Sequence, residues 1–362
     1  MHSKLLMDSK GHQLLLRRLA DVPGEIAGMM VRGLPQLRPA SLATEHFLVT
    51  GTGSSEAHAR YFCNLINLHT DRTATYLPLS GFLNSPTAHL RERTLVVFSQ
   101  GLSPNAQIAL RRHREFAHCI LFSATTPLLA RAVGKMDRAD LITAMVEHGG
   151  DLVLFPLGEE YSTLIRFVGP LCGYLAVLQA VAQLAGSQIS LPKPKRLLSL
   201  FDLEPPAELL ASMKHRPEVY AAGFNLLSAA PITDYAQNLS CKFMEGLFWG
   251  SPQVSDFLQF AHGPFQQSNA SHKPVLILQG GTYQEQEVVE RSLGMIECAG
   301  LEAHVIKVAG DPVLSIFGFE QILNRLVMEL ILHFGIDQVN WPGKGRDDML
   351  YGFCADAKAA AS

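Results

Sequence analysis

The sequence predicts an α/β protein with two doubly wound parallel-sheet subdomains in tandem, preceded by a short helical lead-in. From residue 46 onward, short apolar runs rich in β-forming residues alternate with helical stretches. This alternation is typical of a parallel sheet with helices on both faces. It resumes after a segment rich in Pro, Lys and Ser, LAGSQISLPKPKRLLSL. We therefore expect two such halves joined by a linker.

Each half is defined by its expected strands. The first half has HFLVTG, TLVVFSQ, CILFSAT and DLVLFPLG, and the second has EVYAAGFN, KPVLILQG and EAHVIKVAG. Between the last two runs, EQEVVERSLGMIECAG has the period of an amphipathic helix. Residues 10–35 are expected to be helical, with a break near Pro23. The expected boundaries are a lead-in at 1–40, a first subdomain at 41–190, a linker at 191–215, a second subdomain at 216–336 and a tail at 337–362.

The composition argues against several classes of function. Of 362 residues, 17% are charged and the net charge is −3, so neither nucleic acid nor a membrane surface is an expected partner. The 14 histidines form no HExxH or His/Cys spacing, and we expect no metal. The six cysteines form no CxxC pair, and no signal peptide is evident, which favours free thiols in the cytoplasm. The longest apolar segment, VGPLCGYLAVLQAVAQLAG, is interrupted by Gly, Pro and Gln and is expected to be a buried core helix.

The stretch FLVTGTGSSEAHARYF, residues 47–62, combines a strand, a glycine turn and the start of a helix. Folds use this arrangement to bind an anion on backbone N–H groups. Its two glycines match the start of the dinucleotide fingerprint GxGxxG, but Glu56 stands at the third glycine position. The hydroxyls of Ser54 and Ser55 instead suit a single phosphate monoester. A tight turn with a serine that caps the helix would explain the same residues.

A second turn and a third repeat this design. LVVFSQGLSPNAQIAL, residues 95–110, contains Ser99 and Gln100 and then Ser103 before a proline that opens a helix. The next run ends in FSATTP, which contains Thr126. Because the carboxyl ends of neighbouring parallel strands share one crevice, we expect these turns to form a phosphate cradle.

Two motifs in the second half indicate acid–base chemistry. Lys242 and Glu245 in NLSCKFMEGLFW lie three residues apart and share one face of a helix. The apolar neighbours of Glu245 predict a raised pKa, as a general base requires. A surface ion pair between the two residues is the structural alternative. His262 in FLQFAHGPFQQ precedes Gly-Pro and stands on a turn, where it is either a functional imidazole or an ordinary loop residue.

Taken in order, these motifs resemble the sugar isomerase (SIS) domain family, whose members bind phosphosugars. The GTGSS turn, the SQGLSP turn, the Lys-x-x-Glu pair and the HGP turn resemble the isomerase part of glucosamine-6-phosphate synthase and its deaminase and deglycase relatives. PLGEEYSTLIRF resembles the segment that ends the family's first half, which implies that Ser162 and Thr163 face the sugar. The resemblance extends over about residues 20–345 as a tandem SIS pair.

The resemblance implies a phosphosugar isomerase, acting on glucosamine or fructosamine 6-phosphate or a similar aminosugar phosphate, or a deaminase. Proton transfer between C1 and C2 would pass through a cis-enediol or enolamine, with Glu245 as base beside Lys242. His262 would open the sugar ring from across the interface of a homodimer with shared active sites. No cofactor is implied, and the partner is a small-molecule sugar phosphate. The implied phosphate- and sugar-binding residues are Gly53, Ser54, Ser55, Ser99, Gln100, Ser103, Thr126, Ser162 and Thr163.

The sequence also departs from the family. Its SQGLSP loop is one residue shorter, so Ser99 and Gln100 can be aligned in two ways. Gln259 replaces the acidic residue three positions before the HGP histidine. Lys344 does not have the spacing of the synthase's Schiff-base lysine, and no glutaminase activity is expected. A non-catalytic phosphosugar-binding regulatory protein is the alternative. The absence of a helix-turn-helix extension and the presence of Glu245 and His262 favour the enzyme.

Overall fold

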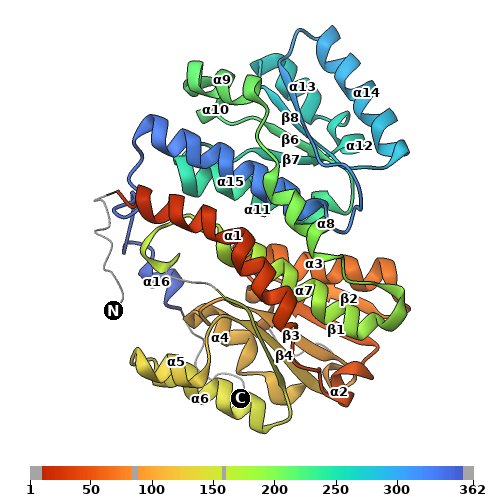
Figure 1. Cartoon of the computed structure of the whole chain (residues 1–362), viewed down its shortest axis with the longest axis vertical. Helices are drawn as coiled ribbons and strands as arrows, with labels where there is room; N and C mark the ends of the chain where they lie inside the picture. Colours follow the sequence, from red (N-terminus) through yellow and green to blue (C-terminus); the bar gives the residue numbers. More distant parts are fainter. Residues whose placement is uncertain (1–9, 84–88, 157–159, 354–362) are drawn as a thin grey trace. The chain divides into compact units, whose positions relative to one another are not determined.

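The computed structural model describes residues 10–83, 89–156 and 160–353, and these contain two parallel sheets (Figure 1). They fall into two compact units, each built on one sheet. The first-sheet unit contains the described residues of 24–156, 168–192 and 342–353. The second-sheet unit contains 10–23, 160–167 and 193–341. Each unit is therefore assembled from three separate stretches of the chain.

The first sheet has five parallel strands in the order β2-β1-β3-β4-β5. The strand order reverses between β1 and β3, which makes this pair the topological switch point of the sheet. Right-handed crossovers favour this winding when strands and helices alternate. The strands are β1 His46–Thr50, β2 Thr73–Tyr76, β3 Thr94–Phe98, β4 His118–Ser123 and β5 Asp151–Leu154.

Alternate residues of these strands pack against different helix layers. On one face, Phe62 of helix α3 (Ser54–His69) contacts the rings of Phe47 and Phe98. On the other, Leu48 and Leu95 join a core cluster with α4 and α6. Because helices cover both faces of the sheet, residues pointing to either face are apolar, and the strands read as continuous apolar runs. The other helices of this unit are α2 Pro39–Leu42, α4 Pro104–Leu110, α5 Pro127–Ala132, α6 Met136–Glu147, α7 Val168–Ala185 and α16 Asp348–Tyr351, with 3₁₀ turns η1 Leu79–Leu83, η2 Leu90–Glu92, η3 His113–Glu115 and η5 Gly186–Gln188.

Helix α7 is the core helix of the first-sheet unit, as its sequence predicts. Within the described residues it is the one helix long and apolar enough to cross a membrane, yet 83% of it is buried inside the protein. It packs against the fully buried His58 of α3. The Nε2 of His58 lies 2.8 Å from the Pro170 carbonyl oxygen, and its ring packs on Tyr174. Burial lowers the pKa of His58 to about 4, so this imidazole is a neutral core group.

The second sheet has four parallel strands in the order β7-β6-β8-β9. Leu227 and Ile277 face a core cluster with helices α12 and α14, and α11 packs on β6, β7 and α15 (Figure 1). The strands are β6 Asn225–Ser228, β7 Gln253–Asp256, β8 Val275–Gln279 and β9 Ala303–Lys307. The helices are α8 Pro194–Leu198, α9 Ala207–His215, α10 Pro217–Ala221, α11 Ile232–Leu247, α12 Phe257–Phe260, α13 Pro264–Ser271, α14 Tyr283–Cys298 and α15 Ser315–Phe334, with 3₁₀ turns η4 Glu160–Ser162 and η6 Ser199–Asp202.

Most expected elements are present, and two expectations differ from the structure. The predicted strand EVYAAGFN is wrong, because Pro217 opens the short helix α10 and β6 begins only at Asn225. The predicted helix break near Pro23 is also wrong, since α1 runs from His12 to Arg32 with this proline inside it. Residues 191–215, expected to be a linker, contain helices α8 and α9.

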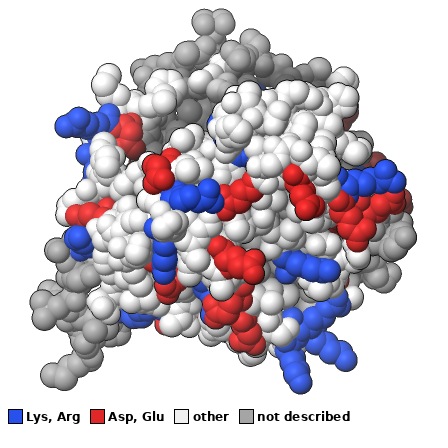
Figure 2. Space-filling model, turned by 90° about the horizontal axis from the view of Figure 1, so that it is seen from above, with Lys and Arg blue, Asp and Glu red and all other residues white. Residues whose placement is uncertain are grey.

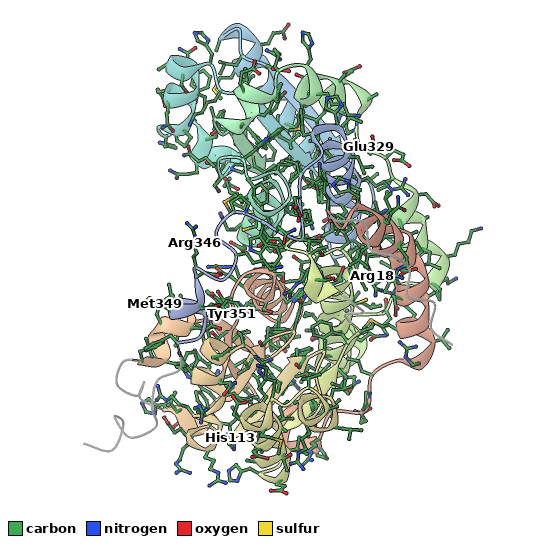
Figure 3. All side chains as sticks on the ribbon, turned by 90° about the vertical axis from the view of Figure 1, so that its left-hand side faces the viewer. Arg18, His113, Glu329, Arg346, Met349 and Tyr351 are labelled. Atoms are coloured by element: carbon green, nitrogen blue, oxygen red, sulfur yellow. The ribbon has the colours of Figure 1, made fainter. Side chains whose placement is uncertain are left out.

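The described surface carries both charge signs. On the face shown in Figure 2, acidic and basic side chains are interspersed, which gives that face no extended field of one sign. In the first-sheet unit, α16 contacts α4 and exposes Met349, which is 94% accessible, together with Tyr351 (Figure 3).

Candidate active site

Two hydroxyl-bearing turns lie at the switch point of the first sheet. β1 ends at Thr50 and is followed by the turn that leads to Ser54 and Ser55, the first residues of α3. The neighbouring strand β3 ends at Phe98 and is followed by the turn of residues 99–103. The structure thus brings the predicted phosphate-binding turns to one edge of one sheet, where open α/β sheets bind ligands.

The glycines of the first turn have a steric function. A Cβ atom on Gly51 would lie 2.3 Å from the carbonyl oxygen of Ser55, so the turn closes tightly on the helix. Gly53 has φ of 60° and is the N-cap residue of α3, which has no side-chain cap in the described chain. The alternative of a serine that caps this helix is therefore not observed. The uncapped helix start leaves N–H groups for an anion.

The second turn contains a strained residue. Leu102 is fully buried and has φ of 48°, a value that costs energy for any residue with a Cβ atom. Arg138 donates a hydrogen bond from Nη1 to the Gly101 carbonyl oxygen at 2.8 Å, which places a guanidinium beside the turn. Ser103 follows as the half-buried N-cap residue of α4, and its Oγ donates to Asn105 Oδ1 at 2.5 Å. Strain of this kind is often found where a turn is shaped for a ligand.

The remaining predicted residues of this edge have structural contacts. Ser99 and Gln100 are buried and bind the end of β4. Ser99 N donates to the Phe122 carbonyl, and Ser123 Oγ donates to the Gln100 carbonyl. Thr126 is the N-cap residue of α5, and its Oγ1 accepts a hydrogen bond from Leu129 N at 3.1 Å. These contacts hold the turns in place.

Glu245 occupies the last turn of α11 in the second-sheet unit and is partly buried. Burial raises the pKa of this carboxyl above its usual value, while the positive charges of Lys242 and Arg166 act in the opposite direction. The direction agrees with the apolar sequence around it. A carboxyl group with a raised pKa can exchange a proton, and a cation near it can stabilise a developing negative charge.

Lys242 forms a buried ion pair with Glu320 of α15, at 2.6 Å, and donates to Asn324 Oδ1 at 2.7 Å. The side chains of Lys242 and Glu320 are only 4% and 0% exposed. Asn238 donates to the other oxygen of Glu320 at 2.9 Å. The ammonium group is thus directed at α15, and it influences Glu245 through its charge. The alternative of a surface ion pair between Lys242 and Glu245 is not observed.

The segment 160–167 lies beside the end of α11. Thr163 is buried and donates from Oγ1 to the Ile165 carbonyl at 3.1 Å. A Cβ atom on Gly246 would lie 3.1 Å from Ile165 Cδ1. The segment carries Ser162 and Thr163, which were expected to face the sugar, and also Arg166, which was not predicted as a site residue.

His262 and Glu245 lie on segments that flank opposite ends of β7. Glu245 lies near the end of α11, which leads to the amino end of β7, whereas His262 follows the carboxyl end of β7 and helix α12. His262 is exposed, and no described hydrogen bond or ion pair joins it to Glu245. Its imidazole is therefore available to another molecule.

The carboxyl edge of the second sheet has a cavity of about 290 Å³, lined among others by Asp256, Glu285 and Thr282. These side chains already bind the helix starts, since Asp256 Oδ1 accepts from Leu258 N at 2.9 Å and Thr282 Oγ1 accepts from Glu285 N at 3.2 Å. The acidic lining disfavours phosphate at this edge. Among the described residues, no group of three or more His, Cys, Asp or Glu side chains could hold a metal.

The buried ion pair predicts a large stability effect. Lys242→Met should lower the free energy of unfolding by about 3–5 kcal/mol, because Glu320 would remain buried without its cation. Lys242→Met combined with Glu320→Gln should recover much of this loss. Urea unfolding followed by circular dichroism measures both.

Lys214→Met is the matched control for this measurement. It removes the exposed pair of Lys214 with Glu329 at 3.3 Å (Figure 3) and should cost at most about 1 kcal/mol. Equal effects of the two lysine substitutions would show that the buried pair has no special role.

Comparison with known proteins identifies the fold. No protein-family model and no curated protein sequence matches the chain. The C-terminal domain of glucosamine-fructose-6-phosphate aminotransferase from Francisella tularensis superposes with a TM-score of 0.71 at 12% identity, covering 90% of this chain and 96% of that one. Glucosamine-6-phosphate deaminase from Thermotoga maritima gives 0.64 at 17%, covering 91% and 97%.

A third structure supports the same assignment. Tagatose-6-phosphate ketose/aldose isomerase from Escherichia coli gives a TM-score of 0.65 at 13% identity, covering 90% of this chain and 93% of that chain. At these identities the likeness concerns the fold, and it extends over both sheets. The chain therefore has the fold of phosphosugar isomerases built from two SIS domains, as its motifs predict.

Proposed function

We propose that this protein is a phosphosugar isomerase that acts on aminosugar phosphates of the glucosamine or fructosamine 6-phosphate type, as an isomerase or a deaminase. The observation that carries the proposal is Glu245, a partly buried carboxyl with a raised pKa near Lys242 and Arg166. Proton transfer between adjacent carbons needs such a base, and a nearby cation stabilises the enediolate oxygen.

In the proposed reaction, Glu245 takes the proton from C2 of the open-chain aldose. The C–H electrons form the C1–C2 double bond, and the C1 carbonyl oxygen is protonated. Return of the proton to C1, with loss of the hydroxyl proton at O2, gives the ketose. From a 2-amino sugar, protonation of the enolamine at C1 with loss of an N–H proton gives an imine at C2. Water adds to that imine, and the C–N bond of the resulting carbinolamine breaks as the oxygen loses its proton and the nitrogen leaves as ammonia. Isomerisation and deamination thus share one base.

The phosphate group is assigned to the switch-point turns of the first sheet. Ser54, Ser55 and Ser103 supply hydroxyls beside the uncapped start of α3, and Arg138 adds positive charge next to Gly101. Backbone N–H groups at a helix start and serine hydroxyls are suitable donors for a phosphate monoester.

Removing two hydroxyls should weaken phosphosugar binding. Ser55→Ala and Ser103→Ala should each reduce affinity by about 1 kcal/mol, because each removes one hydrogen bond to a charged group. Calorimetric titration with glucosamine 6-phosphate measures the effect. Ser292→Ala is the control, since this hydroxyl bonds the Val288 carbonyl within α14. Unchanged affinity in the double variant would place the phosphate elsewhere.

Replacing the base should abolish turnover while binding survives. Glu245→Gln keeps the shape and removes the basicity, so kcat should fall by about 10²- to 10⁴-fold with little change in binding. In the wild type, kcat should rise with pH through the raised pKa of Glu245, because only the carboxylate accepts a proton. Ketose and ammonia are both assayed, and solvent deuterium should enter the product at C1 or C2.

The exposed Glu290→Gln on α14 is the control for this substitution and should retain wild-type turnover. Normal turnover in Glu245→Gln, on a verified substrate, would remove this residue from the mechanism. It would then favour a phosphosugar-binding regulatory protein.

The proposal includes a homodimer in which His262 completes the site of the partner and opens the sugar ring. Its support is that His262 is exposed and lies beyond the opposite end of β7 from Glu245. Mixed dimers of a Glu245→Gln subunit and a His262→Ala subunit should recover activity, because one of the two sites then contains both groups. Inactive mixed dimers, from subunits shown to exchange, would mean that each chain builds its own site.

A further inference from the structure

We propose that Gln338 is a positioning residue for Glu245, and that its side-chain amide holds the end of α11 against the segment that carries Ser162 and Arg166. The inference rests on the proposed function in taking Glu245 as the base. The geometry that supports it is independent of any substrate. Gln338 is fully buried and follows α15 by four residues.

The donor side of the amide binds the helix that carries the base. The last carbonyl groups of a helix have no partner within it. At the left-handed turn that ends α11, the carbonyls of Met244 and Phe243 accept hydrogen bonds from Phe248 N and Trp249 N. The next two, those of Glu245 and Gly246, accept hydrogen bonds from Gln338 Nε2 at 3.1 and 2.9 Å. Gln338 therefore caps the helix at the position of Glu245 itself.

The acceptor side of the same residue binds the segment 160–167. Gln338 Oε1 accepts from Ile165 N at 3.1 Å, and the Gln338 carbonyl accepts from Leu164 N at 3.1 Å. Arg166 is the next residue, and its charge acts on Glu245. One amide thus fixes the distance between a carboxyl group and a cation that lie far apart in the sequence.

The position of Gln338 is itself held from a third direction. Its N–H donates to the Lys10 carbonyl at 3.1 Å, and Lys10 Nζ donates to the Gly335 carbonyl at 2.8 Å. His12 Nε2 lies 2.7 Å from the Ile336 carbonyl. A Cβ atom on Gly11 would lie 3.0 Å from both Thr163 and Val339 side chains. Packing this close leaves Gln338 little freedom to move away from α11.

Only an amide satisfies both sides of this junction. A carboxylate offers oxygens alone and would repel the two helix carbonyls, and a thioether forms neither kind of strong hydrogen bond. The competing explanation is a general contribution to stability, which would leave kcat and the ionisation of Glu245 unchanged in folded protein.

The test compares Gln338→Met with Gln321→Met in the full chain. Gln321 is also a buried glutamine of the second-sheet unit, donating to the Phe201 carbonyl at 3.4 Å. We expect kcat to fall about 10- to 100-fold in Gln338→Met, because a displacement near 1 Å costs that much. We expect KM to change less than about threefold, because the phosphate contacts are unaffected. The control should keep the wild-type kcat.

Two readouts do not need turnover. In Gln338→Met, hydrogen exchange at the Leu164 and Ile165 amides should accelerate, and the titration of Glu245, followed by NMR of labelled glutamate, should move from its wild-type position.

Gln338→Glu is the second variant. Its carboxyl can donate only when protonated. The folded state therefore favours the protonated form, which raises the pKa of this carboxyl. The stability it supplies is present at low pH and is lost as the pH rises through that value.

The outcomes are separable. Wild-type protein without isomerase activity on any sugar phosphate would overturn the proposed function, and the exchange and titration data would still decide the role of Gln338. If Gln338→Met is folded and its exchange and Glu245 titration match those of Gln321→Met, Gln338 is not a positioning residue. The same conclusion follows if its kcat stays within about threefold of wild type in an active enzyme.

Discussion

Parallel pairing of every strand is the constraint on which the rest of the structure depends. It directs the carboxyl ends of all strands of a sheet to one edge. The helices that connect the strands run back and end at the opposite edge. The orders β2-β1-β3-β4-β5 and β7-β6-β8-β9 place a switch point in the same position of both sheets. The two halves nevertheless use their carboxyl edges differently. In the first, helices α3 and α4 begin at hydroxyl-bearing turns without a side-chain cap, whereas Asp256 in the second already caps a helix.

The second-sheet unit specifies its geometry with buried polar groups. Lys242 and Glu320 are paired between α11 and α15, and Gln338 binds both the end of α11 and the segment 160–167. A buried ion pair is costly to break, although an apolar core of the same shape is often equally stable. Both contacts involve α11, the helix that carries Glu245.

The sequence predicts the apolar strands well and misses the two short mixed ones. β1, β3 and β4 are buried on both faces and read as apolar runs, whereas the edge strands β2 and β7 are the mixed four-residue runs TATY and QVSD. The two hydroxyl-bearing turns that follow β1 and β3 could be predicted because each lies within one short stretch of sequence. The ion pair of Lys242 and the cap by Gln338 could not, because their partners come from elements far apart in the chain.

The discontinuous units have a consequence for synthesis. The chain passes from one unit to the other five times, at residues 23/24, between 156 and 160, and at 167/168, 192/193 and 341/342. The hydrogen bond between Gln338 N and the Lys10 carbonyl therefore joins residues from near both ends of the chain. On the ribosome, residues 10–12 lack this partner until the last helices have emerged, and such long-range closure is slow. Neither unit is a contiguous stretch of the chain, so no single cut can release one of them whole.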